Sequence, residues 1–140
     1  MPNPFAGLGL AVDKPGRCLL FHPVTWAPLM VQRDDAPAEQ AHVEILSFDS
    51  TPAQEHRFAR QEQERTLRRE LTAAEDYDAS GVQLARMTTG WLLCDLTGRF
   101  LDVPVSFDMA RELFNGLETR WLRLQVFAYA LTPGNYQPAI

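Results

Sequence analysis

Lysine is nearly absent from this chain of 140 residues: Lys14 is the only one, and the other twelve basic side chains are arginines. Eighteen acidic residues bring the formal net charge to −5, so the basic surface that general binding to nucleic acid phosphates requires is missing. No apolar run approaches the ~20 residues of a membrane span, and the short apolar patch near the N-terminus lacks the basic flank of a secretory signal. We therefore expect a soluble, cytoplasmic protein.

Residues that carry chemistry are also sparse. Cys18 and Cys94 lie far apart, each inside an apolar run, so we interpret them as small buried hydrophobes rather than as a redox or zinc pair. The spacing of His22, His42 and His56 fits no metal site. The sequence predicts no metal and no other cofactor.

The signatures of an active site are missing as well. The Gly-Leu-Gly segment at 7–9 is not followed by a phosphate-loop pattern, no serine lies in a G-x-S-x-G elbow, and neither cysteine has a neighbouring base. Asp95 and Asp102 flank a predicted hairpin, where paired carboxylates are usually structural. We expect a protein that is not an enzyme.

The segment that organises the chain is 118–131, which reads ETRWLRLQVFAYAL. At helical spacing it carries two apolar stripes, one of Leu117, Trp121, Leu124, Ala128 and Leu131 and one of Leu122, Val126 and Tyr129. Its polar edge consists only of Arg120, Arg123 and Gln125. A helix that is apolar around most of its circumference must be enclosed, so we predict a buried C-terminal helix that ends at Pro133-Gly134.

Short apolar runs predict antiparallel strands. We expect one hairpin from 17–21 and 29–33, then a polar linker at 34–40 and a third strand at 42–46. A second hairpin is predicted within 91–105, around a turn that contains Gly98.

Capping residues predict three more helices. Thr51 and Pro52 open a helix that runs to about 69, a capping box at Thr72 and Glu75 opens the next, and Ser106 caps a short helix that ends at Gly116. On the helix after Thr72 a half-buried face consists of Tyr77, Gly81, Leu84, Ala85 and Thr88. The fold class is thus α+β: a mostly helical single domain over 17–140, with one or two short antiparallel β-hairpins and an N-terminal arm at 1–16.

The helix at 51–69 has an unusual composition. Between 55 and 70 it carries five arginines and four glutamates, and its only large apolar side chains are Phe58 and Leu67. Such a helix buries little in its own domain, so it is either solvated and held by Glu/Arg pairs or a docking surface for a protein partner. The residues of this predicted partner surface are Arg57, Phe58, Arg60, Arg65, Leu67, Arg68 and Arg69.

Several motifs together resemble one known family. They are HVEILSFDS at 42–50 with the charged helix after it, LARMTTGW at 84–91, VPVSFDMARELF at 103–114, WLRLQVFAYA at 121–130, Asn135-Tyr136, and the earlier HPVTWAP. Over roughly 20–137 this pattern is similar to that of the small tail assembly chaperones of long-tailed bacteriophages. The turn Asp95-Leu-Thr-Gly98 departs from the tight Asp-Gly of that family, and Phe127 and Tyr129 stand where relatives are often more polar.

The resemblance implies a non-enzymatic assembly factor in the cytoplasm of the infected host. It would bind the tail tube protein, the tape measure protein or both, with self-association left open, and it would contact neither nucleic acid nor membrane. A longer frameshifted product is compatible with the resemblance. Two alternatives stay open: a structural accessory protein retained in the tail or capsid, and a phage protein that binds a host factor.

Overall fold

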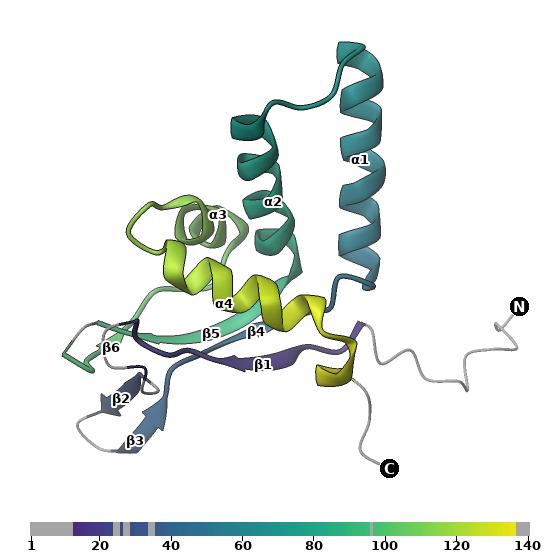
Figure 1. Ribbon diagram of the computed structural model, residues 1–140. Helices are drawn as coiled ribbons and strands as arrows, with labels where there is room; N and C mark the ends of the chain where they lie inside the picture. The colour runs from purple at the N-terminus through teal and green to yellow at the C-terminus, as the bar shows by residue number, and fades with distance from the viewer. Residues whose placement is uncertain (1–12, 24–25, 27–28, 34–35, 96, 137–140) are drawn as a thin grey trace, which may run out of the picture.

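The computed structural model of the chain describes residues 13–23, 26, 29–33, 36–95 and 97–136, with the backbone alone for 30–33 and 36–40. Helices gather on one side of a four-stranded antiparallel sheet (Figure 1). The strands are β1 (Gly16–Leu19), β4 (His42–Ile45), β5 (Thr88–Cys94) and β6 (Phe100–Leu101), in the order β1-β4-β5-β6. The helices are α1 (Thr51–Leu67), α2 (Ala73–Met87), α3 (Phe107–Asn115) and α4 (Arg120–Leu131), followed by the short 3-10 helix η3 (Pro133–Asn135). The predicted α+β class is confirmed.

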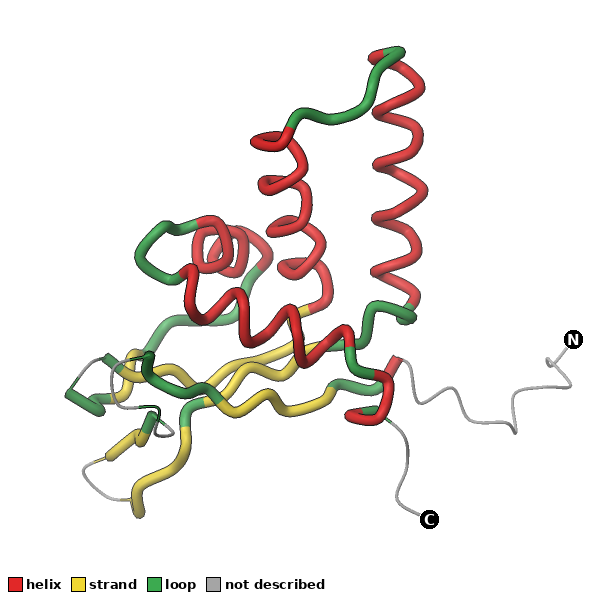
Figure 2. The backbone as a smooth tube through the Cα atoms, in the orientation of Figure 1, coloured by secondary structure: helices red, strands yellow, loops and turns green. Residues whose placement is uncertain are grey.

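The core lies between the helices and one face of the sheet. Strand alternation places Cys18, Val43 and Ile45 on the buried face, whereas Arg17 and Glu44 pair on the other face. The largest fully buried side chains from the helices are those of Phe114, Leu84, Met87 and Val126. The helix α4 runs across the sheet, and α1 and α2 rise away from it as an antiparallel pair (Figure 2).

The first hairpin pairs differently from the prediction. The strand β1 pairs with β4, and β2 (Met30–Arg33) pairs instead with β3 (Ala36–Gln40), inside the segment predicted as a polar linker. The reason is loop closure: two residues separate β2 from β3, whereas the proline-containing HPVTWAP segment would have to close any hairpin of β1 with β2. The prediction of a second hairpin is confirmed, since β5 pairs with β6 around Gly98, whose φ is 84°.

Most helix boundaries follow the sequence signals. The capping box at Thr72 and Glu75 is present, and the hydroxyl of Ser106 accepts a hydrogen bond from the Met109 amide, as predicted. At α1 the predicted N-cap is wrong by one residue: Ser50 occupies that position, and Thr51 donates from both its amide and its hydroxyl to the Asp13 carboxylate. Asp13 belongs to the predicted arm, of which residues 1–12 lie outside the described part.

Only one side of α4 is enclosed. The stripe that contains Leu122 and Val126 is buried, as expected, but Leu124 and Leu131 of the other predicted stripe are 59% and 58% exposed. Leu117, from the same stripe, precedes the helix and is 84% exposed. The sheet offers α4 one surface, so the helix buries one stripe and leaves the other in solvent.

Candidate protein-binding surfaces

A buried arginine joins α2, α3 and α4 where these helices meet. Arg123 is 6% exposed, and its guanidinium donates to the carbonyl oxygens of Tyr77 (2.6 Å) and Phe114 (3.1 Å). It also donates to the side-chain oxygen of Asn115 (3.1 Å) and lies 3.6 Å from the centroid of the Tyr77 ring. We call these four residues the Arg123 cluster. The prediction that Arg123 forms part of a solvent-facing edge is wrong. The Phe114 carbonyl, left free near the end of α3, takes up one of its donors, and the Tyr77 carbonyl and the Asn115 side chain take up others.

A glycine makes room for the Arg123 cluster. Gly81 is buried in α2, and a Cβ atom added to it would lie 1.8 Å from Oδ1 of Asn115 and 2.9 Å from a guanidinium nitrogen of Arg123. The predicted half-buried face of α2, to which Gly81 belongs, is therefore present, and the glycine in it allows close approach.

The stretch 57–80 forms an arm that extends from this body. None of its residues is buried, although it includes the last eleven residues of α1 and the first eight of α2. The buried positions of α1, Ala53 and His56, both precede it. Figure 1 shows its tip as the part of the two helices farthest from the sheet.

The seven residues of the predicted partner surface lie in or beside this arm but do not share one face. Phe58 and Leu67 are 66% and 42% exposed. They are nine positions apart, about two and a half turns at roughly 3.6 residues per turn, so they project from opposite sides of α1. The structure therefore divides the predicted surface into an outer part around Phe58 and a part directed toward α2.

Two of its arginines hold the arm together. Arg60 forms ion pairs with Asp76 of α2 and with Glu64, the latter at 3.6 Å, and Arg69 pairs with Glu75 at 2.7 Å. The hydrogen bond from Arg69, followed by those from Thr72, lowers the pKa of Glu75 to about 2. These charges are engaged within the arm, which favours the solvated-helix interpretation for them.

The other three arginines of the predicted surface differ in their partners. Arg57 donates to the carbonyl oxygen of Phe48 at 3.0 Å, and Arg65 pairs with Glu62 on the same outer side of α1. The side chain of Arg68 makes no hydrogen bond or ion pair within the described ranges, and its backbone ends α1 with a φ of 57°. Phe58, Arg65, Leu67 and Arg68 are thus the predicted residues that no hydrogen bond or ion pair ties to α2 or to the body.

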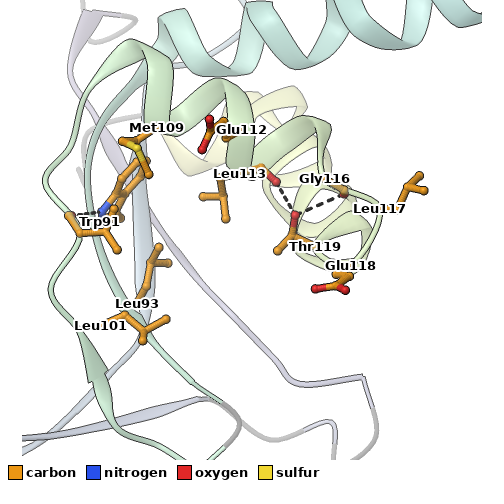
Figure 3. A pocket seen from close by; sticks show the side chains of 11 residues that line it. Trp91, Leu93, Leu101, Met109, Glu112, Leu113, Gly116, Leu117, Glu118 and Thr119 are labelled. Atoms are coloured by element: carbon orange, nitrogen blue, oxygen red, sulfur yellow. Dashed lines mark hydrogen bonds between the residues drawn. The ribbon is translucent and has the colours of Figure 1, made fainter.

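A second candidate surface, an apolar groove, lies between the sheet edge and α3. This apolar groove has a volume of about 570 Å³. One wall is formed by β5, β6 and the segment just after β6, and its residues are Trp91, Leu93, Leu101 and Val103. The other wall is formed by α3 and its connection to α4, and its residues are Met109, Glu112, Leu113, Gly116, Leu117, Glu118 and Thr119 (Figure 3). Leu101, Met109 and Leu117 are 41%, 38% and 84% exposed, so the groove opens to solvent.

The polar groups of the groove are largely satisfied from within. The Trp91 indole N–H donates to the Val103 carbonyl at 2.8 Å. The Thr119 hydroxyl lies in hydrogen-bond contact with the carbonyl oxygens of Leu113 and Gly116 (Figure 3). The lining therefore presents carbon surface, with two carboxylates, those of Glu112 and Glu118.

Sequence reasoning missed this groove, although a signal exists in α3. That helix carries two apolar stripes, Ala110 with Phe114 and Met109 with Leu113. The first is buried in the core and the second lines the groove. Nine helical residues with two apolar sides cannot bury both against a single sheet face.

The exposed stripe of α4 is a third surface. It consists of Leu124, Phe127, Ala128 and Leu131, all exposed. Phe127 lies edge-on to Phe48 with ring centroids 5.0 Å apart, so one end of the stripe joins the core. Leu124 and Phe127 also line a smaller cavity of about 320 Å³ against α2.

Buried ionisable groups fall outside these surfaces. Burial raises the pKa of the Cys18 thiol to about 11 and also raises that of Cys94, which makes both poor nucleophiles near neutral pH. His56 is 6% exposed, and both its ring nitrogens are enclosed without a hydrogen bond of ordinary geometry. Burial, then Arg86 and Arg60, lower its pKa, whereas the nearby Ala79 carbonyl opposes this shift.

Within the described residues no three His, Cys, Asp or Glu side chains come close enough to hold a metal ion. No helix in that part of the chain is long and apolar enough to cross a membrane. The Asp95 carboxylate accepts bonds from the Thr97 amide and hydroxyl and from the Arg99 amide, so it shapes the β5–β6 turn.

Comparison with known proteins identifies no relative: no family model, no curated protein and no solved structure matches this chain.

Proposed function

We propose that the chain is a non-enzymatic assembly factor that binds other proteins, and specifically a phage tail assembly chaperone. In this proposal it associates with the tail tube protein, the tape measure protein or both in the host cytoplasm, and is released when the tail is complete. The class rests on the sequence resemblance.

The observation that carries the protein-binding part is the open apolar groove. Leu101, Met109 and Leu117 are exposed along it, so the groove offers apolar side chains to another molecule. The groove has the volume of a ligand site, but its charged groups are two separate glutamates rather than a nucleophile with a base. Such a surface suits binding rather than chemistry.

The arm supports reversible binding. Phe58 offers one apolar contact. Arg65 and the C-cap residue Arg68 lie in the second half of α1, where no residue after His56 is buried. Exposed charges of this kind influence encounter rate more than affinity. A factor that covers subunits and then leaves requires contacts that dissociate quickly.

Quantitative mass spectrometry of purified virions and of infected-cell lysate, from the phage that encodes the chain, tests this proposal. We expect the protein to be abundant in lysate, to co-purify there with tail tube or tape measure protein, and to be missing from virions. A fixed ratio to the tube or capsid subunit in virions would instead identify it as a structural accessory protein.

A further inference from the structure

We propose that the apolar groove binds an amphipathic α-helix of a partner protein, with Lys or Arg residues flanking the apolar face of that helix. This inference rests on the proposed protein-binding function and names the chemistry of the partner. Three properties of the groove support this inference: its centre is apolar, its margin carries two carboxylates, and the backbone N–H and C=O groups beside it are already hydrogen-bonded.

The centre of the groove requires apolar side chains. Trp91, Leu93 and Leu113 lie deep in it, and Leu101 and Met109 continue this surface outward. The Trp91 N–H and the Thr119 hydroxyl are both engaged in hydrogen bonds within the chain, so the side chains at the centre offer a partner mainly carbon. A polar side chain placed there would lose its hydration without compensation.

The margin selects the flanking charge. Glu112 and Glu118 are both exposed, and neither carboxylate makes an ion pair or hydrogen bond among the described residues. The lining holds no basic side chain. A partner with Lys or Arg beside its apolar face would pair with both carboxylates, and one with Asp or Glu there would be repelled.

The backbone around the groove favours a helix over an added strand. Strand addition needs free N–H and C=O groups along a sheet edge. The edge strand β6 is two residues long; beyond it the Val103 amide donates to Leu101, the Val103 carbonyl accepts from Trp91, and Pro104 has no N–H. Recognition must therefore come from side chains, which a helix presents at i, i+3, i+4 and i+7.

Three synthetic peptides of about 18 residues test this directly. The first has leucines at i, i+3, i+4 and i+7 with lysines beside them, the second replaces those lysines with glutamates, and the third has a central proline in the first sequence. Fluorescence anisotropy of labelled peptides measures binding to the full chain. We expect the lysine peptide to bind at least tenfold more tightly than either of the others, with weaker binding at high salt.

An NMR signal places the peptide. The Trp91 indole N–H, assigned by its loss in Trp91→Phe, lies at the groove wall, and its resonance should shift with the lysine peptide. An unshifted Trp91 signal with a bound peptide would put the site elsewhere and overturn the inference.

Variants of the chain supply matched controls. We expect Glu112→Lys with Glu118→Lys to weaken binding of the lysine peptide about tenfold and to favour the glutamate peptide, whereas Glu70→Lys, exposed in the arm tip, has no effect. Leu117→Ala in the groove should weaken binding, and Leu124→Ala on the exposed stripe of α4 should not. The inference is wrong if only Leu124→Ala matters, or if all three peptides bind equally.

The two proposals can fail separately. If the lysine peptide does not bind, yet the chain associates with tail proteins in infected cells, the helix inference is wrong and the assembly function stands. If the peptide binds with the expected selectivity, yet the chain is built into virions, the groove assignment stands and the chaperone function is wrong.

Discussion

The arm, residues 57–80, and the body differ in what holds them together. In the body, side chains such as Phe114, Leu84 and Val126 are fully enclosed, and the Arg123 cluster ties three helices through buried hydrogen bonds. The arm buries no residue: exposed ion pairs and the Thr72 capping box hold its two helices together, and Tyr77 and Asp78 at its base join it to Arg123 and Asn115 of the body. Exposed ion pairs contribute little each, so the arm should open locally at a much lower free energy than the body unfolds.

The helix α2 crosses from one region to the other. Its first eight residues belong to the arm, and its last seven include Gly81, Gln83, Leu84, Ala85 and Met87, all buried. Local signals and the contacts of Tyr77 and Asp78 with Arg123 and Asn115 therefore maintain the first half, whereas burial in the core maintains the second. The difference separates residues available for partner contacts from residues that the fold requires.

The largest effect should come from Arg123→Ala. This change removes the donors to the carbonyl oxygens of Tyr77 and Phe114 and leaves the Phe114 carbonyl, near the end of α3, without its partner. The expected cost is about 3 kcal/mol in the free energy of unfolding. Urea denaturation followed by circular dichroism measures this. The control is Arg120→Ala, an exposed arginine on the same helix, with an expected change within about 0.5 kcal/mol. Equal effects of the two variants would show that the Arg123 cluster does not stabilise the body.

Gly81→Ala should be the next most damaging. The new Cβ meets Oδ1 of Asn115 and a nitrogen of Arg123, so the side chains must move, at a cost of about 2 kcal/mol. Gly134→Ala is the control, because a Cβ atom there meets nothing within 4 Å. Thermal denaturation of both variants measures this difference. An unchanged melting temperature for Gly81→Ala would mean that α2 and α3 are less closely packed than described.

Acidification should loosen the base of the arm through His56. Its pKa is lowered in the folded protein, so the unfolded chain takes up a proton first as the pH falls below about 6.5, and stability decreases. The proton would enter an enclosed site near Arg60 and Arg86, where Glu75 and Asp78 line the adjoining cavity.

Hydrogen exchange at two pH values, corrected for the intrinsic rate, measures this effect. Amides of 57–80 should lose protection at the lower pH more than those of β4 and β5. In His56→Gln that pH dependence should become smaller. If the variant and the natural chain respond identically, His56 does not control the arm.

How far the sequence predicts the structure also differs between the two regions. Local rules go furthest in the arm: Thr72 and Glu75 predict the start of α2, and the Glu and Arg composition predicts that α1 buries little in its own domain. In the body, local rules fail to predict burial wherever contacts with residues distant in the sequence determine it. Arg123 looks like a surface residue until the carbonyls of Tyr77 and Phe114 surround it.

The groove was missed for a similar reason. Met109 and Leu113 are apolar at helical spacing. This spacing predicts that they share one face of a helix, but it does not show whether that face packs in the core or lines an open surface. Only the arrangement of α3 beside β5 and β6 shows that this stripe faces an open groove. The strand β3 was missed because its sequence, APAEQ, is polar and contains proline, and pairing with β2 outweighs that propensity.

The smallest effect on stability should come from reversing charges on the outer side of the arm. Arg65→Glu with Arg68→Glu breaks only an exposed pair with Glu62, so the melting temperature should change by no more than about 3 °C. If the outer arm around Phe58 docks a partner with acidic groups, the same variant should lose co-purification of tail proteins from infected cells, and Glu70→Lys should retain it. Retained association in both variants would mean that the outer arm is a solvated surface, and partner binding would then be assigned to the groove or to the exposed stripe of α4.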